Sequence, residues 1–297
     1  MNRFATITFA AAATLLTTSA IAQRNFDNVE VRAQEIAPGV AVLFGAGGNI
    51  GVGYGDDATV IIDDQFAPLS GKIEAAIEGL GASPVKYVVN THWHFDHTGG
   101  NEHFGGTGAT IFAHDNVRVR MAAGGTAAGN TTPPAPDAAL PVVTYAQGLR
   151  FHLNGDTINL MYVGGGHTDG DSVVIWEEKN IVHMGDLYFK IPGYPFIDVN
   201  SGGNVYNAMR TLEIVIAMID DETQVIPGHG PMSNKAELIA YRAMMGEAVS
   251  RVDALRAQGM TLEQVVAAQP LSDIDRGEGG FISADAFVTA IWNSEQP

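Results

Sequence analysis

The sequence predicts an α+β fold in which four layers are stacked as an αββα sandwich. Two halves of the chain show roughly the same order of elements: a β-rich stretch, a helix, and then a strand followed by a helix. No linker separates these halves. Hydrophobic residues make up 46% of the 297 residues, which is enough for a packed core and rules out disorder of the whole chain. Two sheets that meet face to face, each covered by helices on its other face, account for the repeated order.

The first half begins with short β-rich runs between residues 40 and 64, separated by Gly-rich or Asp-rich turns as in an antiparallel meander. Residues 68–80 predict a helix because Ile73 and Ile77 recur on one face, and Gly81 ends it. Two short strands are predicted next, at residues 86–90 and 110–113. Residues 122–136 are rich in Ala, Gly, Thr and Pro and are predicted to form a mobile surface loop.

The second half opens with another β-rich set and ends in helices. Its predicted strands are residues 142–145, 149–153, 157–163, 172–176, 180–184 and 223–226. Its predicted helices are residues 205–219, 235–257, 262–268 and 284–293. Because the two halves share one order of elements without a linker, residues 23–297 are expected to form a single domain.

Residues 1–22 have the three-part layout of a secretory signal peptide. A basic residue, Arg3, precedes an apolar run, and small residues at Ala20 and Ala22 suit a signal peptidase. We expect cleavage after Ala22 and a secreted or periplasmic mature protein. No later stretch is long and apolar enough to cross a bilayer, so no membrane contact is expected after cleavage.

Charge and cysteine content exclude several classes of function. The 33 Asp and Glu residues outnumber the 16 Lys and Arg residues, for a formal net charge of −17. Such an acidic surface repels phosphate backbones, so nucleic acid is not an expected partner. With no cysteine, the chain has no disulfide and no thiolate ligand. Any metal ion must therefore be held by His and carboxylate side chains.

Four times in the sequence an apolar strand runs into a turn that carries His or Asp. The seven side chains at these turns are His92, His94, Asp96, His97, His167, Asp186 and His229. Strand ends gathered at one edge of a sandwich would bring them to a common point, as loops on a rigid scaffold often do. One zinc ion takes about four ligands, so five imidazoles and two carboxylates suit two ions.

The segment THWHFDHTGG, followed by His167, Asp186 and His229, resembles the metallo-β-lactamase-fold hydrolases over essentially the whole mature chain. The resemblance implies the αββα sandwich and two Zn²⁺ ions per chain, with iron or manganese as alternatives. It assigns one zinc site to His92, His94 and His167 and a second to Asp96, His97 and His229. Asp186 resembles the carboxylate that bridges the two metals.

The resemblance also implies a mechanism in which a bridging hydroxide attacks a polarised carbonyl group. Asp96 is the expected catalytic residue, because it both ligates a metal and can orient the nucleophile or pass on its proton. Two zinc ions, the carboxylates of Asp96 and Asp186 and one hydroxide leave a charge of about +1, which favours an anionic substrate or oxyanion.

These features imply a small-molecule substrate that is anionic or is a cyclic amide or ester. Because the chain is expected to be exported, β-lactam-type amides are the leading substrate hypothesis. The commonest β-lactamase subgroup has a cysteine where this chain has Asp186, and an Asp there is typical of glyoxalase II-like thioesterases and lactonases. Lactone or thioester hydrolysis on the same centre is the alternative. A zinc-binding protein without turnover is a third hypothesis.

Aromatic residues next to the ligands are expected to form the substrate pocket. Residues 187–203 directly follow a ligand, and Trp93 lies between two of them. The predicted pocket residues are Trp93, Tyr188, Phe189, Lys190, Tyr194 and Phe196. Phe189 stands where lactonases of the family often have Tyr and some β-lactamases have a carboxylate-binding Lys, with Lys190 adjacent. The Gly-rich turn 44–49 is expected to be a mobile flap.

Overall fold

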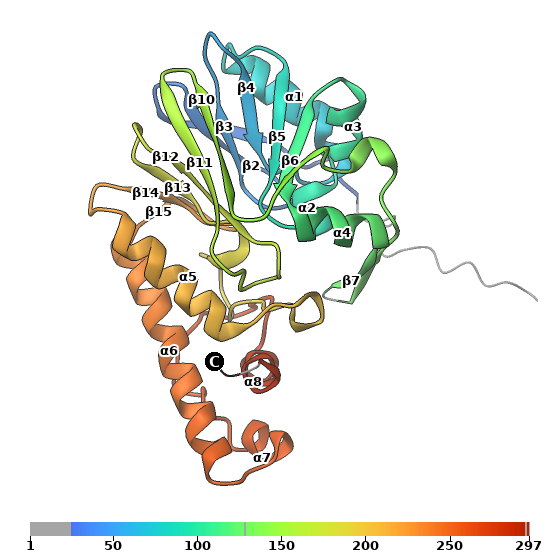
Figure 1. Cartoon of the computed structure of the whole chain (residues 1–297). Helices are drawn as coiled ribbons and strands as arrows, with labels where there is room; N and C mark the ends of the chain where they lie inside the picture. The colour runs from blue at the N-terminus through green and yellow to red at the C-terminus, as the bar shows by residue number, and fades with distance from the viewer. Residues whose placement is uncertain (1–24, 128, 295, 297) are drawn as a thin grey trace, which may run out of the picture.

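A computed structural model of the chain describes residues 25–127, 129–294 and 296, so the predicted signal peptide lies outside the described residues. Two large sheets stand side by side in Figure 1. The first has the order β1 (Arg32–Ala37), β2 (Val40–Phe44), β3 (Ile50–Gly53), β4 (Thr59–Ile62), β5 (Val85–Asn90), β6 (Thr110–His114) and β9 (Val143–Tyr145). The second has the order β10 (Gly148–Leu153), β11 (Asp156–Tyr162), β12 (Ser172–Trp176), β13 (Ile181–His183), β14 (Gln224–Ile226) and β15 (Ser233–Asn234).

The alternation of side chains along each strand produces separate apolar layers. In β2, Val40 and Val42 pack with Trp176 of the second sheet, whereas Ala41 and Leu43 face the helices on the outside of the first sheet. Successive side chains of a strand point to opposite faces, so a strand buried on both faces reads as a continuous apolar run. The core between the sheets is thus distinct from the two cores beneath the helices.

Helices cover both outer faces. The first sheet is covered by α1 (Ser70–Gly79) and α3 (Asn101–Gly106), and the second by α5 (Val205–Met218) and α6 (Lys235–Ala257). Helix α8 (Ala284–Asn293) packs against α6. The remaining helical segments are η2 (Ala67–Leu69), α2 (Phe95–Thr98), α4 (Asp115–Ala123), η3 (Asp137–Ala139), η4 (Gly185–Leu187), η5 (Val199–Ser201) and α7 (Leu262–Ala267). This arrangement confirms the predicted αββα sandwich.

The structure differs from the sequence-based prediction mainly around residues 101–136. Helix α4 was not predicted, because its Val-Arg-Val-Arg run alternates like a strand, yet Val117 and Met121 are spaced by one helical turn and both are buried. The stretch 122–136, predicted to be a mobile surface loop, contains a two-stranded hairpin of β7 (Gly125–Ala127) and β8 (Asn130–Thr132). Backbone pairing overrides the low strand propensity of Gly and Asn there.

The ends of β5, β13 and β14 lie close together, because β13 and β14 are neighbours in the second sheet and β5 lies in the sheet that faces it (Figure 1).

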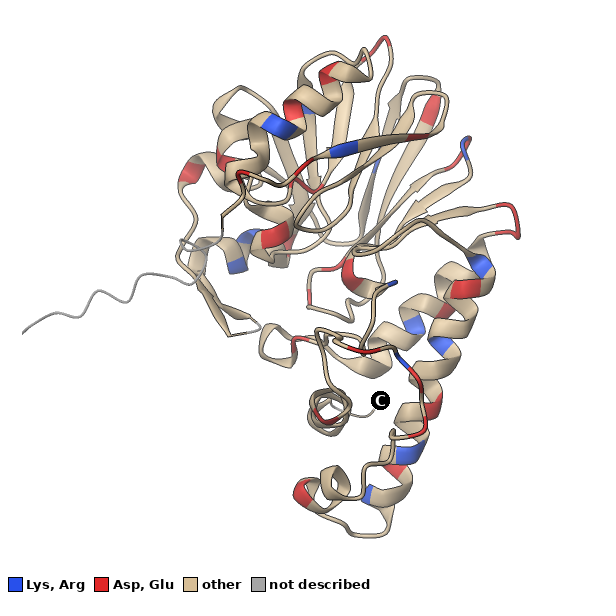
Figure 2. Ribbon diagram, turned by 180° about the vertical axis from the view of Figure 1, so that it is seen from behind, with Lys and Arg blue, Asp and Glu red and all other residues tan. Residues whose placement is uncertain are grey.

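Lys and Arg residues are scattered among more numerous acidic residues, including those along α6 (Figure 2). Within the described part of the chain, no helix combines the length and apolar character that a membrane span requires.

Candidate metal centre

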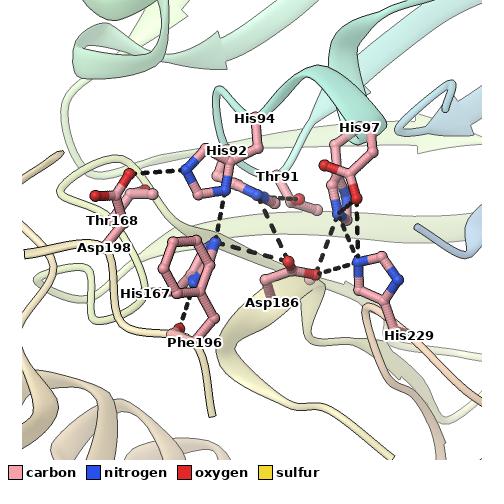
Figure 3. Close-up of polar contacts among 12 residues, drawn as sticks. Thr91, His92, His94, His97, His167, Thr168, Asp186, Phe196, Asp198 and His229 are labelled. Atoms are coloured by element: carbon pink, nitrogen blue, oxygen red, sulfur yellow. Dashed lines mark hydrogen bonds and ion pairs between the residues drawn. The ribbon is translucent and has the colours of Figure 1, made fainter. Parts of the chain in front are cut away.

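The structure brings all seven predicted metal ligands to one edge of the sandwich. Figure 3 shows six of them around one centre: His92, His94, His97, His167, Asp186 and His229. His92 and His94 follow β5, and Asp96 and His97 lie in α2 directly after them. The other three come from the loop before β12, from η4 after β13 and from the turn after β14, and they are His167, Asp186 and His229. Their donor atoms form two groups, within each of which all atoms lie within 4.8 Å of one another.

The first group consists of His92, His94, His167 and Asp186, all buried. Nδ1 of His94 lies 2.8 Å from Nε2 of His167, and Oδ2 of Asp186 lies 3.6 Å from the same His167 nitrogen. Oδ2 of Asp186 is also 3.9 Å from Nε2 of His92. Three imidazole nitrogens and one carboxylate oxygen therefore converge on a single point.

The second group consists of Asp96, His97 and His229 and shares the other oxygen of Asp186. Oδ1 of Asp186 lies 3.1 Å from Nε2 of His97 and 3.4 Å from Nε2 of His229. Oδ2 of Asp96 lies 3.5 Å from that His229 nitrogen. Asp186 thus has one carboxylate oxygen beside each group, which is the placement that a bridging ligand needs.

Outer partners determine which nitrogen of each imidazole faces inward. His94 donates from Nε2 to Asp198 over 2.9 Å, and His167 donates from Nδ1 to the carbonyl oxygen of Phe196 over 2.7 Å. His97 donates from Nδ1 to Asp63 over 2.8 Å. The nitrogens that remain carry lone pairs directed at the centre, as in metal-bound histidines with a hydrogen-bonded second nitrogen.

These inward-facing atoms fit metal ions. Nε2 of His92 and Oδ1 of Asp186 are buried and have no hydrogen-bond partner among the described residues. The facing nitrogens of His94 and His167 would place two lone pairs against each other, because the outer nitrogen of each ring carries the proton. A buried polar atom without a partner is costly, and a cation between the groups removes that cost.

Burial and charge set the protonation states around the centre. Burial lowers the pKa of His92 well below its usual value and that of His167 to about 4, which keeps both rings neutral and able to bind a metal. Burial alone raises the pKa of Asp186, but His97 and His229 lower it well below its usual range. Asp186 is therefore ionised. The carboxylates that favour a proton on His97 also favour a metal cation at the same position.

A pocket of 270 Å³ opens directly over these groups. Its polar lining residues are His94, Asp96, Asn130, Asp186 and His229. Its apolar lining residues are Phe95, Ala127, Phe189, Ile191, Phe196 and Phe281. Among the described residues, no Lys or Arg side chain lines this pocket. The pocket is therefore aromatic on its walls and acidic and imidazole-bearing at its base.

A family model described as the metallo-beta-lactamase superfamily matches residues 45–232, a span that includes all seven ligands. The chain belongs to the metallo-beta-lactamase superfamily. It is a hydrolase of that superfamily with a candidate metal site.

Curated relatives differ in the reactions that their names describe. The chain is 30% identical over 210 residues to a hydroxyacylglutathione hydrolase of Rhodospirillum rubrum, covering 68% of this chain and 70% of that protein. It is 26% identical over 166 residues to the metallo-beta-lactamase type 2 of Bacteroides fragilis, covering 55% and 60%. It is 25% identical over 209 residues to the 2,4-dinitroanisole O-demethylase subunit alpha of Nocardioides sp., covering 68% of this chain but only 59% of that protein.

Solved structures show the same fold. A stereoselective inverting sec-alkylsulfatase from Pseudomonas sp. is 16% identical, with a TM-score of 0.67 over 88% of this chain and 50% of that chain. A metallo-beta-lactamase from Cronobacter sakazakii is 23% identical, with a TM-score of 0.62 over 78% of this chain and 97% of that chain. At these identities the likeness extends to the fold alone.

Of the six pocket residues predicted from the sequence, two line the pocket and four lie outside it. Phe189 and Phe196 line the pocket, and the ring of Phe189 stacks on His229 with centroids 5.7 Å apart. Tyr188 and Lys190 do not line it, which corrects the expectation from the sequence. Residues 188–190 are extended, so their side chains alternate: Phe189 faces the pocket while its two neighbours face α6.

Contacts on the far side account for both neighbours of Phe189. The hydroxyl group of Tyr188 lies 2.8 Å from Oγ of Ser233. Nζ of Lys190 donates to the carbonyl oxygen of Met232 and to Glu237 over 2.8 and 2.6 Å. Lys190 is thus paired with a carboxylate of this chain outside the pocket and is not placed to bind a substrate anion.

Trp93 and Tyr194 also lie outside the pocket, a second correction to the predicted set. The ring of Trp93 is buried in an apolar cluster with Val117 and Met121 of α4 and does not line the pocket. Tyr194 donates to the carbonyl oxygen of Leu271 over 3.2 Å and stacks on Phe287 of α8. Both aromatic rings stabilise the scaffold around the site.

The 44–49 turn does not have the contacts expected of a mobile flap. The backbone N–H of Gly48 donates to the carbonyl oxygen of Asp96 over 3.0 Å. The buried side chain of Asn49 donates to the carbonyl oxygens of Pro227 and Gly230, both over 2.8 Å. The 44–49 turn therefore links α2, which carries Asp96, to the turn that carries His229, and these hydrogen bonds fix it in place.

Sequence reasoning missed two carboxylates that contact the ligands. Asp63, at the end of β4, accepts hydrogen bonds from the N–H and hydroxyl group of Thr91 and from His97. Its position at a strand end beside β5 is a signal that could have revealed it. Asp198, whose pKa is lowered by its bonds to His94 and Ser201 despite its burial, lies in a loop with no such signal.

These carboxylates change the charge balance of the centre. Asp63 and Asp198 add two negative charges to those of Asp96 and Asp186, so two divalent cations would be neutralised before any hydroxide is counted. The expectation of a positively charged centre that favours an anionic substrate omitted these two residues.

Proposed function

We propose that this chain is an exported dizinc hydrolase that cleaves the amide or ester bond of a small molecule bearing an apolar group beside its carbonyl carbon. The observation that carries the proposal is the pocket, whose base is the two ligand groups and whose walls are Phe189, Phe196 and other apolar side chains. Cyclic amides, including β-lactams, and cyclic esters are the compact substrates that suit a space of 270 Å³.

The ligands divide between two ions in this proposal. His92, His94 and His167 would hold one, Asp96, His97 and His229 the other, and Asp186 would contact both. Zinc ions bound there would supply Lewis acidity and a source of hydroxide near neutral pH. The carboxylate of Asp96 is 24% exposed at the base of the pocket, where it can orient an attacking water molecule and accept its proton.

The carboxylate found on many β-lactams would find no cationic side chain among the described pocket residues. A hydrogen bond to a charged group is worth about 1.5–3 kcal/mol, so an enzyme that depends on such an anchor would lose about 10- to 150-fold in kcat/KM without it. We therefore expect that a β-lactam carboxylate contributes little to recognition here.

A matched pair of substrates tests this expectation. Zinc-loaded protein is assayed with a chromogenic β-lactam and with its methyl ester, alongside an acyl-homoserine lactone and an acyl thioester. We expect turnover that EDTA abolishes and zinc restores, with kcat/KM for the methyl ester within about threefold of that for the free acid. No turnover of any of the four compounds would reject the substrate class. A kcat/KM for the methyl ester more than about tenfold below that for the free acid would contradict the lack of a cationic anchor in the pocket.

Thioester hydrolysis is the second candidate function. It is supported by the 30% identity to the hydroxyacylglutathione hydrolase of Rhodospirillum rubrum, which spans 70% of that protein. The thioester in the same panel tests it directly: a kcat/KM for the thioester at least tenfold above those for the lactam and the lactone would favour this function.

Export is supported by the layout of residues 1–22. Expression of the full chain in a Gram-negative host, followed by cell fractionation and N-terminal sequencing, tests it. We expect the protein in the periplasm or medium with Gln23 as its first residue. Intact Met1 on protein in the cytoplasmic fraction would contradict export.

A further inference from the structure

A segment of the C-terminal region, residues 276–282, is attached to the edge of the pocket. Gly193 donates its N–H to the carbonyl oxygen of Arg276 over 2.8 Å, and Nε of Arg276 donates back to the carbonyl oxygen of Gly193 over 2.9 Å. The N–H of Tyr194 donates to the carbonyl oxygen of Ile282 over 3.0 Å. Both ends of the segment are thus hydrogen-bonded to the stretch that leads from Phe189 to Phe196.

Two glycines allow the two backbones to touch. A Cβ atom added to Gly280 would lie 2.3 Å from Cα of Gly193, and one added to Gly193 would lie 2.9 Å from Cα of Gly280. Gly193 also has a φ of +94°, which side-chain-bearing residues rarely adopt. The close approach of the two backbones holds the segment against Gly193 and so positions the residue that follows Gly280.

That residue is Phe281, which lines the pocket although its side chain is 63% exposed. Among the exposed large hydrophobic side chains of the described residues, it is the one that lines the pocket. Its ring meets Phe196 edge-on, with centroids 6.0 Å apart, and Phe196 in turn stacks on His94 at 5.8 Å. A continuous aromatic wall therefore runs from a metal ligand to the rim of the pocket.

We infer that Phe281 determines substrate specificity by covering the apolar substituent of the substrate. An exposed Phe ring is costly in water, and an apolar group packed against its pocket-facing side would reduce that exposure. Phe281 lies outside residues 45–232, the span matched by the superfamily model, so this wall belongs to the C-terminal region of this chain. The inference rests on the proposed function, because it names the substrates that the proposed hydrolase prefers.

The test compares p-nitrophenyl acetate with p-nitrophenyl hexanoate in zinc-loaded wild-type protein and in Phe281→Ala. We expect Phe281→Ala to lose about tenfold in kcat/KM for the hexanoate, mostly through KM, and less than twofold for the acetate. Phe281→Leu should recover most of the loss because it restores an apolar side chain. Equal losses on both esters, or no loss on either, would overturn the inference.

A matched control is Ile239→Ala, which removes an apolar side chain of 45% exposure on α6, outside the pocket lining. It should leave the ratio of the two kcat/KM values unchanged. A change in that ratio as large as that of Phe281→Ala would overturn the assignment to Phe281.

Binding of a neutral apolar fluorophore, N-phenyl-1-naphthylamine, separates this inference from the proposed function. If wild-type protein turns over neither ester, the hydrolase proposal fails for esters, but the fluorophore still reports on the wall. We expect its dissociation constant to rise about fivefold or more in Phe281→Ala and to stay within twofold in Ile239→Ala. An unchanged constant in Phe281→Ala would overturn the inference whether or not turnover is found.

Discussion

Each histidine of the first ligand group has one nitrogen held by a fixed partner and the other turned toward the centre. The partners differ: a hydroxyl group at Thr91, a carboxylate at Asp198 and a carbonyl oxygen at Phe196. Of these three partners, only Asp198 places a negative charge beside its histidine. A charged hydrogen-bond acceptor makes the imidazole ring a stronger metal ligand. The individual contributions of these residues can therefore be separated by substitution.

Replacing Asp198 tests its effect on the metal. In Asp198→Ala, His94 loses the acceptor for Nε2 and can turn away from the centre, so zinc affinity of the first group should fall about 10- to 100-fold. In Asp198→Asn, the amide oxygen can still accept the hydrogen bond but carries no charge, so the zinc affinity should fall by less than in Asp198→Ala. Competition with a chromophoric chelator measures both constants. Wild-type affinity in Asp198→Ala would show that the bond to His94 does not position the ligand.

Asp96 is expected to contribute to chemistry more than to substrate binding. Asp96→Asn keeps the size of the side chain but removes a proton acceptor at the base of the pocket and one charge from the second group. We expect kcat to fall about 10²–10⁴-fold with a smaller change in KM. Asp221→Asn, at an exposed position, is the control for loss of charge alone. Wild-type kcat in Asp96→Asn would mean that the proton acceptor lies elsewhere.

At the scale of elements, short turns between strands determine the geometry of the site. The 44–49 turn joins β2 to β3, and its Asn49 side chain donates to carbonyl oxygens on both sides of His229. His183 of β13 donates from Nε2 to the carbonyl oxygen of Asn49 over 3.0 Å. The turn is thus bonded to both sheets, which explains why its glycines do not make it a flap.

Asn49→Ala should destabilise the protein and weaken the second ligand group. The change leaves the carbonyl oxygens of Pro227 and Gly230 without their side-chain donor in a largely buried place, at a cost of about 1–3 kcal/mol. Urea unfolding measures the free energy, and zinc content after dialysis measures the ligand group. As a control, Asn25→Ala removes an Asn side chain at an exposed position. Unchanged stability in Asn49→Ala would mean that water replaces the missing donor.

At the scale of the whole molecule, a strongly acidic chain places four carboxylates around one buried centre. Asp63, Asp96, Asp186 and Asp198 repel one another without cations between them. The ligands also come from both sheets, since His92 follows β5 and His229 follows β14. Metal binding at these groups would therefore be coupled to the packing of the two sheets against each other.

Removal of the metal should lower the thermal stability of the whole protein. Binding to the folded state alone stabilises it by about 2.7 kcal/mol when free zinc is at 100 times its dissociation constant. We expect EDTA-treated protein to melt at a lower temperature than zinc-loaded protein and readdition of zinc to restore the Tm. Calcium at the same concentration is the control, because it prefers oxygen ligands to imidazole. Equal Tm values with and without zinc would contradict this coupling.

The sequence by itself determined the layers of the fold and the set of candidate ligands. Apolar runs of strand length and helical periodicity depend on local spacing, and so does the placement of His and Asp just after strands. A ligand such as His229 could be identified because its turn follows a buried strand. The outward direction of Tyr188 and Lys190 could also have been read from the alternation of an extended chain.

Only the tertiary structure decided what surrounds the ligands. Asp198 meets His94 across 104 positions of sequence, and Asn49 meets Gly230 across 181. Phe281 reaches the pocket because two glycines far apart in the chain let their backbones touch. Such contacts depend on how separate elements pack, and local spacing carries no information about them. The substrate pocket therefore had to be found in the packed molecule, whereas the candidate metal ligands were already evident in the sequence.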